Sequence, residues 1–138
     1  MTHTYDTPQH AEDAFYDALD EGKLDDMLSV WADADDICCL LPMQPMILGR
    51  QGVVDLFTRI FSQQHRVSLE VRHLGWIETG DIAIHQVEET LLNMPPGTPP
   101  PPPFYGTNIY RRDTSGWRLI AHQNAPTPQP AQGPATTR

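Results

Sequence analysis

The sequence predicts an α+β domain in which three helices come first and four antiparallel strands follow. Over residues 8–62 the apolar side chains recur at spacings of three and four, which is the helical period. From residue 66 onward they alternate with the period of two that β-strands show. Tight turns join these strands, which favours an antiparallel meander over alternating βαβ units. The 138 residues suffice for one such domain with a core of its own.

The first helix is predicted over residues 8–20. Thr7 suits an N-cap, and Pro8 suits the first turn, where no intrahelical N–H is needed. Gly22 follows the helix, where a left-handed residue commonly ends one. The apolar stripe consists of Ala11, Ala14, Phe15, Ala18 and Leu19.

Two more helices are predicted over residues 24–32 and 50–62, with a short strand over 37–41 between them. Residues 42–49 contain two prolines, so we expect an irregular segment there. The second half of the chain then supplies the meander. Its strands are predicted at 66–77, 82–93, 104–112 and 117–125.

Two proline-rich segments fall outside this plan. Residues 95–103 include five consecutive prolines and predict a stiff, projecting polyproline II loop between two strands. Such a loop is either a rigid spacer or a docking site for a proline-reading partner. The predicted domain spans residues 1–125, and residues 126–138 are polar and proline-rich, which predicts a disordered tail.

Composition excludes several classes of protein. The formal net charge of −9 disfavours binding to nucleic acid. No run approaches the ~18 apolar residues of a membrane span, and the first residues lack the basic and apolar regions of a signal peptide. We therefore expect a cytoplasmic protein that contacts neither membrane nor nucleic acid. Adjacent Cys38 and Cys39 are interpreted as reduced thiols on a strand.

Four segments resemble motifs of the nuclear transport factor 2-like superfamily, specifically of its SnoaL-like and ketosteroid isomerase-like members. They are EGKLDDMLSVWADADDICCLLP, ILGRQGVVDLFTRIF, TGDIA and NIYRRDTSGWRLIAHQNA, and the resemblance covers about residues 8–125. It implies a cone-shaped α+β barrel with three N-terminal helices on a curved antiparallel sheet. It also implies a pocket at the open end of the cone and a homodimer formed through the outer face of the sheet.

The resemblance argues against the ketosteroid isomerase mechanism. The Asp base of those enzymes falls on Leu41, which cannot accept a proton. Their Tyr falls on Phe15, one residue from Tyr16, and their buried Asp falls near Asn108. Leu41 and Phe15 cannot replace the base or the tyrosine hydroxyl. Only the role of the buried Asp, which donates a hydrogen bond, can be taken over here, by the amide of Asn108.

A different base is predicted on the strand at 82–93. Alternation puts Gln86 and Glu88 on one face, and the family pattern places this face toward the pocket. In an apolar cavity Glu88 would have a raised pKa and act as a general base. The alternative is that Glu88 pairs across the sheet with Arg72 or Arg112.

The remaining candidates are predicted ligand contacts. Trp31 and Tyr110 are expected in the pocket wall, with Gln86 and Tyr16 beside them. The resemblance to the isomerases places the face of Ala121 and Gln123 inward, so strict alternation turns His122 outward, toward an interface or the surface, unless a β-bulge reverses it. The position of His85 is equally open. No metal site is expected, because the six histidines show no HxH or HxxxH spacing.

Two functions fit these features. One is cofactor-free proton chemistry on a small apolar carbonyl compound, of the isomerase, dehydratase or hydrolase type. There Glu88 is the base, and Asn108 or Tyr110 donates a hydrogen bond to the oxyanion. The other is a non-catalytic module that binds a small molecule or assembles. The sequence does not decide whether the protein is an enzyme.

Overall fold

The computed structural model describes residues 3–64 and 66–128. Most of the predicted C-terminal tail lies outside these residues. The helices are α1 (Pro8–Glu21), α2 (Leu24–Val30) and α3 (Gly49–Ser62). The strands are β1 (Cys38–Leu40), β2 (Ile47–Leu48), β3 (Leu69–Thr79), β4 (Ile82–Leu91), β5 (Phe104–Asp113) and β6 (Gly116–Pro126).

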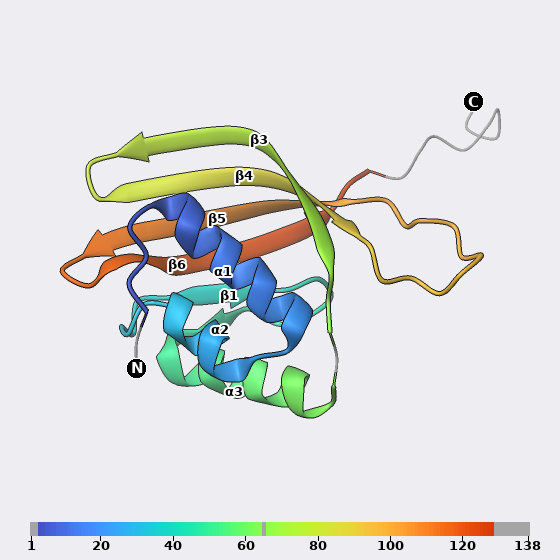
Figure 1. The fold of residues 1–138 in the computed structure, drawn as a ribbon, viewed down its shortest axis with the longest axis horizontal. Helices are drawn as coiled ribbons and strands as arrows, with labels where there is room; N and C mark the ends of the chain where they lie inside the picture. Colours follow the sequence, from blue (N-terminus) through green and yellow to red (C-terminus); the bar gives the residue numbers. More distant parts are fainter. Residues whose placement is uncertain (1–2, 65, 129–138) are drawn as a thin grey trace.

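The strands form one open, curved sheet in the order β2-β1-β6-β5-β4-β3. The meander from β3 to β6 is antiparallel, as predicted, whereas β1 runs parallel to β6 and makes the sheet mixed. Helix α1 crosses one face of this sheet, and α2 and α3 lie beside it (Figure 1). The predicted cone-shaped α+β class is confirmed. The short β2 lies within the segment that was expected to be irregular.

Local capping fixes the ends of α1. The Thr7 side chain accepts a hydrogen bond from the backbone N–H of His10 at 3.0 Å, and Pro8 occupies the first turn. Gly22 ends the helix in the left-handed region with φ 68°. The apolar stripe between these caps packs against the sheet. The buried residues of α1 are Pro8, Ala11, Glu12, Phe15, Ala18 and Leu19.

Aromatic side chains join the helices in the core. Trp31, which follows α2, has its ring centroid 6.3 Å from that of Phe15 and 6.3 Å from that of Phe57. All three side chains are buried. Because they come from or follow α1, α2 and α3, this contact sets how the helices pack against one another.

Two irregularities in the sheet decide which side chains face α1. In β3 the register shifts between His73 and Gly75, so both His73 and Trp76 point to the inner face. In β6 Ile120 is an extra residue, since Tyr110 pairs with Leu119 and the next pair is Ile109 with Ala121. Beyond this bulge the alternation reverses.

The bulge in β6 corrects the expectation for His122. Strict alternation turned this ring outward, but the extra residue turns it inward, where it is buried. His85 is buried on the same side of the sheet.

The loop between β4 and β5 projects from the body, as its prolines predict (Figure 1). No helix among residues 3–64 and 66–128 is long and apolar enough to cross a bilayer.

Gly116 is a testable constraint on the β5–β6 hairpin. Its φ is 103°, and an added Cβ would lie 2.8 Å from the Tyr5 carbonyl oxygen. We expect Gly116→Ala to lower the free energy of unfolding by roughly 3 kcal/mol. Gly80→Ala is the control, because its φ is also positive but nothing lies within 4 Å of the new Cβ; it should cost only about 1 kcal/mol. Urea denaturation measures both, and equal losses would contradict the steric argument.

Candidate functional site

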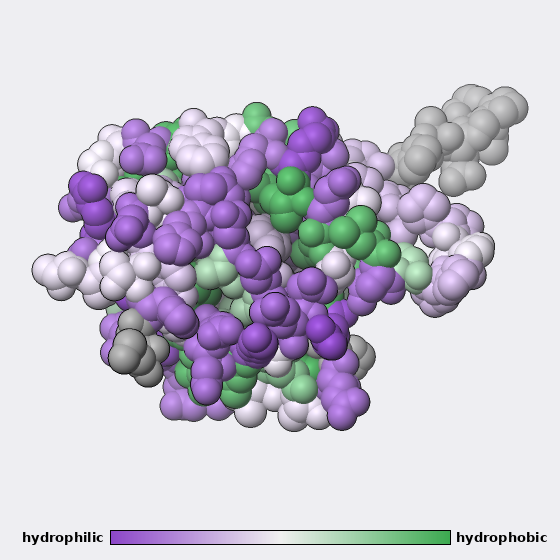
Figure 2. All heavy atoms as spheres, in the orientation of Figure 1, coloured by the Kyte–Doolittle hydropathy of each residue, from purple (hydrophilic) through white to green (hydrophobic). Residues whose placement is uncertain are grey.

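A cavity of about 440 Å³ opens at one end of the cone. It lies between the sheet, the end of α1 and one side of α3. Most of its wall is apolar, and polar side chains stand at two places. The apolar lining residues are Leu19, Leu41, Pro42, Leu56, Ile60, Val67, Leu69, Leu91 and Phe104. Apolar side chains also reach the surface where β3 crosses β4 (Figure 2).

Three polar residues line the cavity from the sheet side: Glu89 of β4, and His122 and Asn124 of β6. The Asn124 amide donates to Glu89 Oε1 at 2.9 Å. The polar residues of the opposite wall are Gln44, Arg59 and Gln63. The cavity therefore has an apolar wall with polar groups at the sheet and on the side opposite it.

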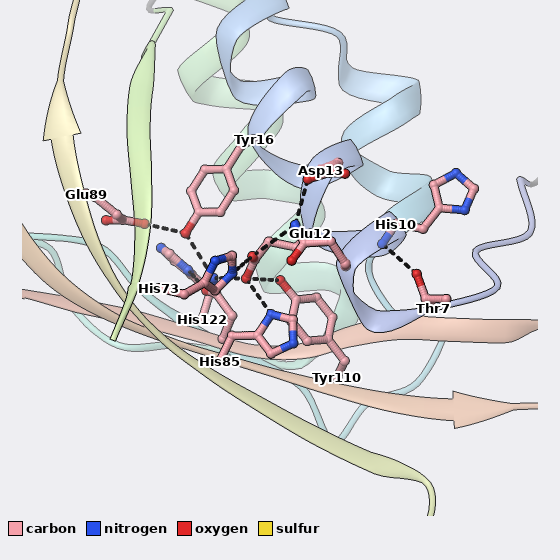
Figure 3. A network of polar contacts seen from close by, with 12 residues as sticks. Thr7, His10, Glu12, Asp13, Tyr16, His73, His85, Glu89, Tyr110 and His122 are labelled. Atoms are coloured by element: carbon pink, nitrogen blue, oxygen red, sulfur yellow. Dashed lines mark hydrogen bonds and ion pairs between the residues drawn. The ribbon is translucent and has the colours of Figure 1, made fainter. Parts of the chain in front are cut away.

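Tyr16 of α1 holds the other oxygen of Glu89. Its hydroxyl donates to Glu89 Oε2 at 2.6 Å and accepts from the Asn108 amide at 2.9 Å (Figure 3). Burial, together with the neighbouring Glu89 charge, raises the pKa of Tyr16 far above its usual value. The phenol therefore stays protonated and acts as a fixed donor to Glu89.

Asn108 also fixes the tautomer of His122. Because its amide nitrogen donates to Tyr16 and to Glu12, its oxygen Oδ1 is left as an acceptor, 2.5 Å from His122 Nδ1. The ring must then carry its proton on Nδ1. Burial lowers the pKa of His122, so the ring is neutral near pH 7. Nε2 carries the lone pair and has no hydrogen-bond partner among the described residues, and the ring lines the cavity.

Glu12 of α1 is the centre of a second cluster on the side of the helix facing β3 and β4. Its carboxylate is 1% exposed. Oε2 lies 2.9 Å from His85 Nδ1, 3.2 Å from the Asn108 amide nitrogen and 3.1 Å from the Tyr110 hydroxyl. Oε1 lies 2.5 Å from His73 Nε2 (Figure 3).

These donors keep Glu12 ionised. Burial alone raises the pKa of a carboxyl, and here it is the largest single influence. Hydrogen bonds from His85, Asn108 and His73, with the charge of His85, outweigh it and lower the pKa of Glu12 below 4.5. An ionised carboxylate is therefore stable in the core.

A family model for SnoaL-like domains matches residues 9–127. The chain belongs to the SnoaL-like family. A comparison with curated protein sequences found no match.

Solved structures agree with this assignment. A candidate calcium/calmodulin-dependent protein kinase type II association domain from Thiobacillus denitrificans is 36% identical, with a TM-score of 0.83 over 91% of this chain and 99% of that one. A candidate dehydratase of the nuclear transport factor 2-like family from Streptomyces avermitilis is 25% identical, with a TM-score of 0.73 over 86% of this chain and 93% of the other. A ketosteroid isomerase-like protein from Erwinia carotovora atroseptica shares the fold at 16% identity, with a TM-score of 0.65 over 88% and 94% of the two chains.

This SnoaL-like domain places Glu88 differently from our expectation. Glu88 points to the outer face of the sheet, and its Oε1 accepts from Arg72 at 3.1 Å. Gln86 is exposed on the same face. The inward expectation for both is wrong, because β4 turns the other set of residues toward α1: Ala83, His85, Val87 and Glu89. The alternative pairing with Arg72 is the one observed.

The aromatic residues that were predicted to contact a ligand do not line the cavity either. Trp31 is part of the core rather than of the cavity wall, and Tyr110 is buried against Glu12. Tyr16 does not line the cavity and is linked to its lining through Glu89 and, by way of Asn108, through His122. Asn108 lies behind His122 and does not line the cavity. Of the seven predicted site residues, only His122 is part of the lining.

Sequence reasoning missed Glu12, His73, Glu89 and Asn124. A signal for Glu12 existed, since it stands three residues before Phe15 and seven before Leu19, on the buried stripe of α1. A carboxylate at such a position predicts buried donors around it.

Removal of the charge of Glu12 should destabilise the domain. We expect Glu12→Gln to lower the free energy of unfolding by roughly 3 kcal/mol at pH 7, because the amide cannot accept from all the donors. The folded-state pKa is below the unfolded value, so Glu12 contributes stability above pH 4.5 that is lost as the pH falls through the folded pKa. In Glu12→Gln the free energy of unfolding, measured by urea denaturation at several pH values, should therefore fall less steeply as the pH is lowered. Glu88→Gln, at a partly exposed ion pair, should change stability by less than about 1 kcal/mol.

Proposed function

We propose that this SnoaL-like domain binds a small, largely apolar compound with one polar end and catalyses proton transfer on it. The observation that carries the proposal is the position of His122, whose Nδ1 is held by Asn108 and whose ring lines the cavity. The apolar lining supports a hydrophobic ligand. The reaction needs only side chains that the cavity supplies.

His122 is the base in this mechanism. Its Nε2 accepts a proton from a carbon next to a carbonyl, and the resulting imidazolium returns the proton to another position of the substrate. The charge of Glu89 favours the protonated ring and so stabilises the intermediate. Isomerisation and dehydration both follow from such a transfer, and the 25% identical relative is described as a candidate dehydratase.

Base-catalysed ring opening of 5-nitrobenzisoxazole tests this proposal without knowledge of the natural substrate. This bicyclic compound requires only a base in an apolar cavity. We expect the wild type to open it, and His122→Gln to lower kcat/KM by roughly 100-fold. Because burial lowers the pKa of His122 below 6.5, the rate should fall to half of its plateau value only at a pH below 6.5.

Glu88→Gln is the matched control, since Glu88 lies on the outer face of the sheet. It should leave kcat/KM unchanged. A wild-type rate no greater than that of buffer, or the same rate in folded His122→Gln, would contradict the role of His122.

A second candidate function, assembly, is favoured by the outer face of the sheet. Cross-strand pairing aligns an apolar row there, and nothing in the described chain covers it. Its members are Ile77, Ile84, Ile109, Ala121, Cys38 and Leu48. Ile77 is 52% exposed. The 36% identical relative is named as an association domain, which supports self-association through this face to form a homodimer.

Ile84→Lys tests this assembly, because it puts a charge in the middle of the apolar row. We expect the wild type to sediment as a dimer and Ile84→Lys as a monomer with an unchanged circular dichroism spectrum. Leu92→Lys is the control, because Leu92 is 57% exposed but follows β4 and lies outside the row. A monomeric wild type would exclude the dimer.

We also propose a cytoplasmic location. Cys38 and Cys39 are both free thiols, which is typical of a reducing compartment.

A further inference from the structure

Three potential metal ligands meet between α1 and the edge of the sheet, outside the cavity. They are a carboxylate oxygen of Glu12, Nε2 of His73 and Nδ1 of His85, and these atoms lie within 4.8 Å of one another. They come from α1, β3 and β4, so no spacing in the sequence shows them together. We propose that Glu12, His73 and His85 form a binding site for a divalent transition metal ion such as Zn²⁺.

The ligand types and distances suit such an ion. Two imidazoles and one carboxylate are a common ligand set for Zn²⁺, with bonds of about 2.0–2.2 Å. Ligand atoms around one ion are then separated by roughly 3–4 Å. The present separations of 2.5 Å and 2.9 Å from the two rings to Glu12 require only small side-chain movements.

The ring of His85 is consistent with a bound cation. A proton on Nδ1 satisfies Glu12 but leaves Nε2, with or without a proton of its own, buried with no partner among the described residues. A proton on Nε2 instead makes Nδ1 face the carboxylate with two lone pairs in opposition. A cation between Nδ1 and Glu12 removes that repulsion and uses both as ligands.

Residues around the cluster supply an outer shell. Asn108 and Tyr110 donate to Glu12 Oε2 and hold the carboxylate in place. Such outer contacts orient metal ligands and increase affinity. Asn108 and Tyr110 are not among the three ligands, so both contacts to Glu12 can remain when a cation binds.

An acidic groove gives access from solvent. It has a volume of about 320 Å³ and lies between α1 and β3. Asp13 and Asp17 line it together with Glu12 and His73. The negative charge raises the local concentration of cations, and the His73 side chain is 32% exposed on this side. The groove leaves room for water as a further ligand.

Equilibrium dialysis of the full chain against Zn²⁺, after treatment with a chelator, tests the site. We expect one ion per chain. His73→Gln should weaken binding by at least about 10-fold, and because His73 lies at the edge of the cluster the fold should remain, as judged by circular dichroism. His10→Gln is the matched control, since His10 is exposed on α1 and outside the cluster.

Trp76 provides a second measurement. Its ring centroid lies 3.9 Å from that of His85 and 5.2 Å from that of His73. Cu²⁺ in the site should quench its fluorescence at one equivalent, and the quenching should disappear in both His73→Gln and Trp76→Phe. Less than one Zn²⁺ per chain, equal affinity in His73→Gln, or unchanged quenching in Trp76→Phe would overturn the proposal.

Discussion

The structure depends on one buried carboxylate. Glu12 lies on the face of α1 that packs against the sheet, where an unpaired charge would cost several kcal/mol. Donors from β3, β4 and β5 offset this cost, and each of them must stand at the correct position of its strand. The carboxylate therefore specifies how α1 sits on the sheet more narrowly than apolar packing does. Apolar contacts tolerate small shifts that hydrogen bonds do not.

The same helix face connects this constraint to the cavity. Tyr16 follows Glu12 by four residues, so both side chains project toward the sheet one turn apart. Asn108 bonds to both of them and to His122, and Tyr16 bonds to Glu89. Tyr16 and Asn108, which do not line the cavity, thus help to fix the directions of the Glu89 and His122 side chains that do. Such support by surrounding hydrogen bonds is what holds a functional group in a defined geometry.

Local patterns in the sequence were sufficient to predict the helices and the main strands. They were not sufficient to predict which side chains of a strand face the helices. Thr7, Pro8 and Gly22 predict the ends of α1 because caps act over a few residues. The faces of β4 were assigned wrongly because both are apolar: Ala83 and Val87 face α1, while Ile84 belongs to the apolar row outside. The bulge at Ile120 has no local signal, and without it His122 points the wrong way. Contacts between distant segments, such as that of Glu12 with His85, depend on packing that no short motif encodes.

The cavity also explains how this domain differs from the ketosteroid isomerases that its sequence resembles. Leu41, where that resemblance would place a base, is part of the apolar lining. The polar groups stand instead on β4 and β6, as Glu89, His122 and Asn124. Members of one fold can thus differ in activity, because the chemistry of a cavity depends on which few positions of its wall carry polar side chains.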